Sequence, residues 1–152
     1  MSRYMRASMA CLVVATLLSG CIDPKDARPG LALSGDRAEE APADWSFTDA
    51  HPEIAIQVAT PYWIPHSVTI WCGSVGGELF LAARDPETKR WPGWVERDPE
   101  VVIRVGGKLY GGTLSRIEEG ELLTGVRAAY AAKYERDEMP PNIRYWRFVP
   151  EA

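Results

Sequence analysis

The sequence predicts an α+β domain in which six short strands form a small antiparallel barrel with flanking helices. Three observations support this prediction. Six runs rich in β-branched and aromatic residues alternate between apolar and other side chains, which is typical of half-buried strands. Glycine-containing links join several of these runs at hairpin spacing, so neighbouring strands are expected to be antiparallel. Two further stretches have helical signals and can lie against the sheet.

The first half of the domain contains one helical turn and three strands. Asp44 or Ser46 can cap a short helical turn. The following run places Ile54, Ile56 and Val58 on one face, as a half-buried strand does. Prolines at positions 61 and 65 restrict the residues before them and favour an extended or turning connection. The expected elements are a helical turn at 44–49 and strands at 53–60, 67–72 and 78–83, the last two joined by a glycine-rich link at 73–77.

The second half contains two helices and three strands. Pro92 limits the first helix to one or two turns, and Pro99 ends it. Gly106-Gly107 has the length of a two-residue hairpin turn. Gly111-Gly112 lies inside a strand and indicates a bulge or the close approach of another segment. The expected elements are helices at 91–98 and 121–136 and strands at 100–105, 108–117 and 143–149.

The first twenty residues have the organisation of a secretory signal. Arg3 and Arg6 precede an apolar run that is too short to span a bilayer as a mature helix. The run ends in Leu18-Ser19-Gly20-Cys21, which resembles the lipobox of bacterial lipoproteins. This resemblance implies cleavage before Cys21 and lipidation of that cysteine, whereas an ordinary signal peptide with a chance cysteine is the alternative. We expect a lipid-anchored protein of the cell envelope, outside the cytoplasm.

Two further features bear on this placement and on the partners of the mature chain. Ile22, instead of aspartate, follows the lipidated cysteine, which favours the outer membrane in a source that has one. Removal of Arg3 and Arg6 leaves 15 basic and 21 acidic residues, a formal net charge of −6. This acidic balance argues against nucleic acid or an anionic membrane surface as the main partner.

The mature chain is expected to consist of a tether and one domain. Few large apolar side chains occur between residues 22 and 43, so this segment cannot bury enough surface to offset the entropy of ordering. We therefore predict a signal peptide at 1–20, a lipidated cysteine and flexible tether at 21–43, and a single folded domain at 44–152.

Cysteine and histidine usage limits the chemistry of the domain. Cys11 leaves with the signal and Cys21 carries lipid, so Cys72 has no partner for a disulfide within the domain. Its strand position favours a small core residue, with a reactive thiol as the alternative. His51 and His66 lack the spacing of metal ligands, so we expect no metal site. The sequence also lacks a G-x-S-x-G elbow, a Walker-type loop and a G-x-G-x-x-G motif after a strand.

A basic and tryptophan-rich segment at residues 84–94, here called the corner, follows the third strand. The order of elements around this corner resembles the split β-barrel superfamily of flavin and deazaflavin reductases, which includes the pyridoxamine-phosphate oxidases. The pattern runs from a strand of type x-V-x-I through a hairpin, a Ser/Thr-plus-basic cluster and a Trp-containing turn to a D/N-P-x-V-x-V strand and a glycine hairpin. This chain supplies Val68 and Ile70, residues 79–83, Thr88-Lys89-Arg90, Trp91 and Trp94, residues 98–103, and Gly106-Gly107. The resemblance covers residues 54–148.

The resemblance implies a split barrel that binds FMN or a deazaflavin at this corner, and it implies a homodimer. The Ser/Thr-plus-basic cluster would hold the cofactor phosphate through charge-assisted hydrogen bonds. Small residues on the neighbouring strands would line the ring, and a tryptophan would cover it. The cofactor-binding residues implied by position are Thr69, Ala82, Ala83, Thr88, Lys89, Arg90, Trp91 and Trp94.

Plainer interpretations exist for the same residues. Lys89 and Arg90 are interleaved with acidic residues, a mixture that often forms a solvated turn with weak surface ion pairs. Trp91 and Trp94 are three apart and can pack one helical face onto the barrel.

The sequence leaves two candidate functions open. The first is a membrane-anchored reductase that acts on a small acceptor of the quinone or nitro type, with its catalytic residues unidentified. The second is a non-enzymatic lipoprotein that binds a small ligand or a cell-envelope partner.

Overall fold

The structure is a computed structural model that describes residues 22–152. The predicted signal peptide and the predicted lipidation of Cys21 lie outside the described residues. Within residues 22–152, no helix is both long and apolar enough to cross a membrane.

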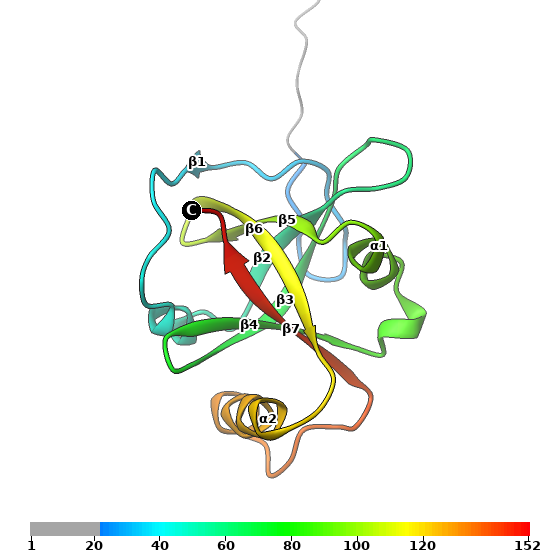
Figure 1. Cartoon of the computed structure of the whole chain (residues 1–152). Coiled ribbons are helices and arrows are strands. Elements are labelled where there is room, and N and C mark those ends of the chain that lie inside the picture. The colour runs from blue at the N-terminus through cyan, green and yellow to red at the C-terminus, as the bar shows by residue number, and fades with distance from the viewer. Residues whose placement is uncertain (1–21) are drawn as a thin grey trace, which may run out of the picture.

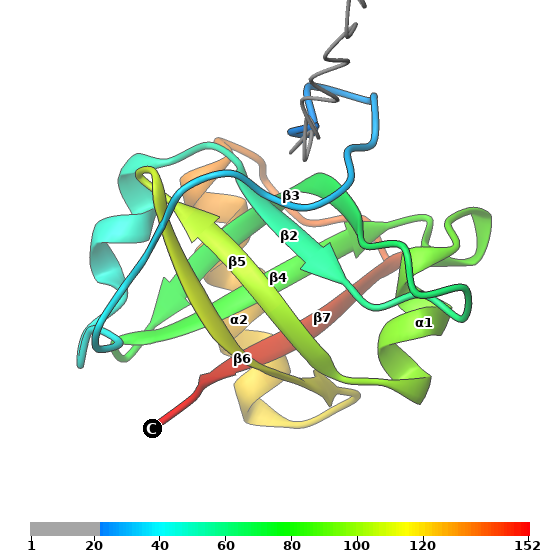
Figure 2. The ribbon, with the colours of Figure 1, turned by 90° about the horizontal axis from the view of Figure 1, so that it is seen from above.

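Six antiparallel strands of the described region close into a barrel, which confirms the predicted fold class (Figures 1 and 2). The strands follow one another around the barrel in the order β6-β5-β2-β3-β4-β7, and pairing between β6 and β7 closes it. A short additional strand, β1 (Asp36–Arg37), pairs in parallel with β6. The barrel strands are β2 (Ile54–Val58), β3 (His66–Val75), β4 (Glu78–Arg84), β5 (Glu100–Val105), β6 (Lys108–Ile117) and β7 (Ile143–Pro150).

Two glycine pairs make the tight hairpin turns of the barrel. Gly76 and Gly77 have φ of +59° and +80°, and Gly106 and Gly107 have +55° and +82°. Positive φ at both central positions is the type I′ geometry that fits the right-handed twist of paired strands. The first turn is shorter than the predicted link at 73–77, because β3 continues to Val75, which pairs with Glu78.

The predicted irregularity at Gly111-Gly112 is a close approach of another segment. Both glycines keep an unbroken register with β5, so no bulge forms there. A Cβ atom on Gly112 would lie 2.4 Å from the carbonyl oxygen of Val149, and one on Gly111 would lie 2.5 Å from the carboxylate of Glu151. The small residues therefore allow the C-terminal end of the chain to pass over β6.

The helices lie outside the barrel. The short helix α1 (Trp91–Arg97) follows the 3-10 turn η2 (Pro86–Thr88), and a second 3-10 turn, η1 (Ser46–Ala50), precedes β2. The long helix α2 (Glu121–Lys133) packs across β3 at the opposite end from the N-terminal segment (Figure 1). It ends three residues before the predicted end, because Glu135 takes a left-handed φ of +53°.

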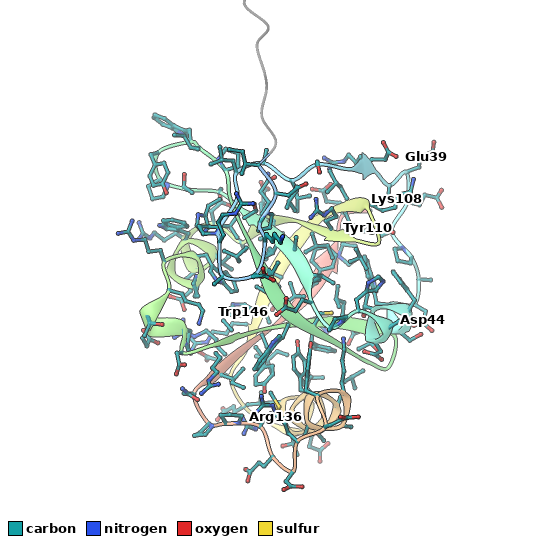
Figure 3. All side chains as sticks on the ribbon, turned by 180° about the vertical axis from the view of Figure 1, so that it is seen from behind. Glu39, Asp44, Lys108, Tyr110, Arg136 and Trp146 are labelled. Atoms are coloured by element: carbon teal, nitrogen blue, oxygen red, sulfur yellow. The ribbon has the colours of Figure 1, made fainter. Side chains whose placement is uncertain are left out.

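Two apolar clusters hold these layers together. One fills the barrel interior and includes Trp146, which Figure 3 shows among the strands. The other lies between α2 and the outer face of β4, around Tyr130 and Phe80. The hydroxyl of Tyr130 donates a hydrogen bond to the carbonyl oxygen of Phe80 at 2.8 Å, so the one polar atom of this buried ring is satisfied.

Cys72 is a buried core residue, as predicted. Its thiol is free and lies 3.4 Å from the ammonium nitrogen of Lys133, which also donates to the carbonyl oxygen of Cys72 at 2.7 Å. Burial raises the pKa of the Cys72 thiol, and the nearby charge of Lys133 opposes this only in part. The neutral thiol is therefore favoured, and Lys133 ties the end of α2 to β3.

The segment predicted to be a flexible tether instead follows the barrel surface. Asp23 forms an ion pair of 2.6 Å with Arg104 and accepts a hydrogen bond from the backbone of Ser34 at 2.9 Å. Gly30 and Ser67 exchange backbone hydrogen bonds of 2.8 and 3.0 Å. The apolar content is low, but backbone and carboxylate groups find partners along the barrel edge. We call residues 22–37 the N-terminal strap.

The contact between Gly73 and Tyr130 makes a testable prediction about the packing of α2. A Cβ atom on Gly73 would lie 2.9 Å from the Tyr130 ring. Gly73→Ala should therefore destabilise the fold by about 1–3 kcal/mol through overpacking. Gly125→Ala is the matched control, because Gly125 lies in the interior of α2 with open space around its Cβ position. It should stabilise the fold by about 0.5–1 kcal/mol. Denaturant unfolding of both variants measures this, and equal effects would contradict the packing.

Candidate functional site

The candidate site lies in a fork between β3 and β4. These strands pair from Val75 and Glu78 as far as Trp71 and Ala82. Beyond that point β4 continues to pair only with β7, while the free edge of β3 pairs with the strap through Ser67. Figure 2 shows the strap crossing beside β3 on this side of the barrel. The separated strands leave a gap, which is bordered by Lys89 and Arg90, the start of α1 and the strap.

A cavity of about 460 Å³ occupies this fork. Its volume falls in the range of roughly 300–1,000 Å³ that is typical of small-molecule sites. Three parts of the chain line it: the strap, the two diverging strands with one residue that precedes β2, and the basic corner. The lining residues are Asp26, Ala27, Arg28, Pro29, Glu53, His66, Val68, Thr69, Ile70, Trp71, Ala82, Ala83, Arg84, Lys89, Arg90 and Trp91.

Six of the eight residues implied as cofactor-binding line this one cavity. They come from three separate elements and from the turn before α1, so only the folded chain brings them together. Ala82 and Ala83 present small side chains at the wall, and Trp91 is a fixed aromatic surface because its ring packs 5.1 Å from that of Trp146. The six residues are Thr69, Ala82, Ala83, Lys89, Arg90 and Trp91.

The other two implied residues, Thr88 and Trp94, do not line the cavity. The hydroxyl of Thr88 donates to the carbonyl oxygen of Asp85 at 2.8 Å, which closes the η2 turn. The ring of Trp94 meets those of Tyr62 and His66 edge to face, at 5.9 and 5.1 Å between centroids. Both side chains therefore contact neighbouring parts of the protein and do not face the cavity.

The cavity wall carries more positive than negative side chains. Four cations, contributed by the strap and the corner, face two carboxylates; they are Arg28, Arg84, Lys89 and Arg90, against Asp26 and Glu53. The acidic neighbours of the corner, Glu87 and Glu96, are not part of the wall. Both pair with Arg144, at 2.5 and 2.7 Å, so Arg144 offsets their charge outside the cavity. The arrangement favours an anionic ligand.

His66 is a wall residue that sequence reasoning missed. It lies just outside the strand predicted at 67–72, but it begins β3 and lines the cavity beside the basic corner. Burial lowers the pKa of His66, and the positive charge of Arg90 lowers it further. The imidazole is therefore neutral near pH 7. The alternation of β3 could have indicated it, since His66 lies two residues before Val68.

The strap supplies four more missed residues, Asp26 to Pro29. No local signal could have found them, because their place depends on a contact between segments far apart in the sequence. The Thr69 hydroxyl donates to the carbonyl oxygen of Asp26 at 2.7 Å and fixes the strap at the cavity edge. The opposite rim includes Trp71, over whose ring Arg136 lies at 5.7 Å, at the α2 end of the molecule in Figure 3.

Within residues 22–152, no group of three or more histidine, cysteine, aspartate or glutamate side chains is placed to hold a metal ion.

Comparisons with known proteins identify the fold. No family model matches the sequence, and no curated protein matches it either. Solved structures do resemble it. A candidate 5-nitroimidazole antibiotic resistance protein from Bacteroides thetaiotaomicron has a TM-score of 0.58 at 14% identity, covering 84% of this chain and 86% of that one. HutZ, the heme storage protein from Vibrio cholerae, has a TM-score of 0.57 at 14% identity, covering 70% and 86%.

A third similar structure is a candidate pyridoxamine 5′-phosphate oxidase from Listeria innocua, with a TM-score of 0.53 at 18% identity, covering 68% of this chain and 87% of that one. The chain has the split-barrel fold of pyridoxamine-phosphate-oxidase-like proteins. This confirms the fold that the resemblance implied. At such low identities the similarity describes the fold, and the split-barrel fold is shared by proteins named for different ligands and roles.

The proximity of His66 and Arg90 can be tested by titration. The pKa of His66 should lie below its ordinary value of 6.5, and Arg90→Gln should raise it, because the substitution removes a positive charge from beside the imidazole. Histidine NMR signals followed against pH measure both values. An unchanged His66 pKa in Arg90→Gln would show that the two side chains do not share the cavity.

The depressed pKa of His66 also makes the free energy of unfolding depend on pH. Because the folded-state pKa of His66 is depressed, the folded protein binds fewer protons there than the unfolded chain does. Its contribution to stability is complete above about pH 6.5, the ordinary histidine pKa, and is lost as the pH falls towards the folded-state value. The wild type should therefore lose more unfolding free energy on acidification than His66→Gln. Denaturant unfolding at a series of pH values measures the difference.

Proposed function

We propose that this split barrel binds a phosphorylated flavin-type cofactor, FMN or a deazaflavin, in the fork cavity and reduces a small acceptor of the quinone or nitro type. One observation carries the proposal: six of the residues implied by the resemblance line a single cavity of suitable size. A bound flavin supplies the hydride chemistry, and the protein's part is to bind, orient and shield.

The wall residues fit the parts of such a cofactor. Lys89 and Arg90 offer cationic donors for a phosphate, and the guanidinium fork of Arg90 can meet two phosphate oxygens at once. Ala82 and Ala83 leave room for a flat ring beside the strands, and Trp91 gives it an apolar wall. His66 places a neutral imidazole at the same wall. There it can donate a hydrogen bond to the small molecule that is to be reduced, or accept one from it.

A second candidate function is ligand binding without catalysis. The strap favours this function. Asp26 to Pro29 form part of the cavity wall, and the hydroxyl of Thr69, a residue implied to line the cofactor ring, donates its hydrogen bond to the strap. A similar structure, HutZ, is named for heme storage. Flavin reduction separates the two candidates: a bound flavin that passes electrons to an acceptor supports the reductase, and a colourless or redox-inert ligand supports the binder.

The phosphate role of Lys89 and Arg90 makes the central prediction. Each charge-assisted hydrogen bond contributes about 1.5 kcal/mol at exposed positions, or roughly tenfold in affinity. Lys89→Ala with Arg90→Ala should therefore weaken FMN binding roughly a hundredfold, while binding of riboflavin, which lacks the phosphate, should be unaffected. Quenching of flavin fluorescence on titration with protein measures both.

Controls separate this role from a general loss of charge. Lys108→Ala with Arg116→Ala removes two exposed cations on β6, outside the cavity, and should leave FMN affinity unchanged. Equal loss in both double variants, or equal loss for FMN and riboflavin, would contradict a phosphate site at the corner. The homodimer implied by the resemblance stays a proposal, and sedimentation of the same samples gives the oligomeric state.

A further inference from the structure

The loop between β2 and β3 carries an exposed apolar tip. Three consecutive large side chains, Tyr62, Trp63 and Ile64, are 51%, 93% and 52% exposed. Trp63 is the exposed tryptophan of the described region, since Trp45, Trp91, Trp94 and Trp146 are buried and Trp71 is half-buried. A contiguous exposed apolar group of this kind usually marks an interaction surface.

The tip is held in shape by the loop itself. Prolines at positions 61 and 65 restrict the backbone on both sides of it. The backbone N–H of Trp63 donates to the carbonyl oxygen of Thr60 at 3.2 Å. The hydroxyl of Thr60 donates to the carbonyl oxygen of Ile64 at 2.7 Å. Trp63 takes a left-handed φ of +58°, which is costly for a large residue. The loop backbone is therefore held in a shape that leaves the Trp63 side chain exposed.

The tip and the start of the strap lie at the same end of the molecule. In Figure 1 the strap begins at the top, where the β2–β3 loop also projects, while α2 lies at the bottom. Ile22, which is itself exposed, follows the predicted lipid attachment site directly. Because Asp23 is paired with Arg104, a lipid on Cys21 would be attached within two residues of a fixed point on the barrel.

We propose that this end of the protein lies on a lipid bilayer, with Tyr62, Trp63 and Ile64 inserted at the headgroup level as a second contact beside the lipid on Cys21. Tryptophan and tyrosine favour the membrane interface, where the ring is in apolar surroundings and its polar atom stays wet. The two contacts together fix the orientation of the barrel on the membrane, which lipid on a flexible tether would not do.

This inference depends on the predicted lipidation and is independent of the proposed cofactor. The test uses the full chain, expressed with its own signal, purified and reconstituted into phosphatidylcholine vesicles whose acyl chains carry bromine near the headgroups. Bromine quenches tryptophan on contact, so the wild type should be quenched relative to the same vesicles without bromine. Trp63→Ala should lose most of that quenching. Its FMN titration should match the wild type, because Trp63 does not line the cavity.

Two further variants distinguish insertion from the mere presence of a fluorophore. Tyr62→Ser with Ile64→Ser keeps Trp63 and removes the apolar side chains around it, so its quenching should fall. Leu122→Ala removes an exposed apolar side chain from α2, at the opposite end, and should be quenched like the wild type. Both side chains are about half exposed and lie outside the barrel strands, so the far-ultraviolet circular dichroism spectrum of the double variant should match the wild type.

The outcomes decide the proposal in either direction. Quenching that depends on Trp63, with lipid found on Cys21 by mass spectrometry, supports the proposal, whereas a purified chain without that lipid overturns the arrangement of two contacts. A wild type that is unquenched by brominated vesicles overturns it. So does a dimer that Trp63→Ala converts to monomers without any bromine quenching, since the tip would then be covered by a second copy of the chain.

Discussion

The separation of β3 from β4 beyond Trp71 and Ala82 determines where a site can form on this barrel. A closed sheet pairs its backbone groups all the way around and leaves no opening in the wall. Here β4 leaves β3 and continues with β7 alone, so one stretch of β3 has an unpaired edge. Unpaired backbone groups need partners, and the strap supplies them through Gly30. The cavity is the space that remains between the diverging strands and the strap.

Two acidic side chains beside the corner are paired outside the cavity, so that its wall carries more positive than negative charge. The corner between β4 and α1 contains acidic and basic residues in nearly equal measure along the sequence, which argues for a solvated turn. In the fold, Arg144 on β7 pairs with Glu87 of the corner and with Glu96 of α1, while Lys89 and Arg90 line the cavity. The side chain of Arg144 is mostly buried on β7, so the barrel itself positions the guanidinium that pairs with these two carboxylates.

The sequence predicts the parts of the fold that depend on local pattern. Alternation along each strand, positive-φ glycine pairs and prolines at helix ends are short-range signals, and the strands and helices they predict are present with shifts of a few residues at their ends. The site was predicted in part. Lys89 and Arg90 could be found from their place in a motif, whereas Thr88 and Trp94 share that motif but turn towards Asp85 and His66. The motif does not give these contacts, which depend on the folded turn that begins at Asp85 and on the packing of α1.

The strap escaped prediction for a different reason. Its composition resembles that of a disordered segment, and its order comes from pairing with residues more than thirty positions away, such as Ser67 and Arg104. One physical consequence follows from its position. A single length of chain is both the wall of the cavity and the continuation of the N-terminus, so any force that draws Ile22 away from the barrel also pulls on the contact between Asp26 and Thr69. By thermodynamic reciprocity, a molecule that holds the wall in place would in turn resist that displacement.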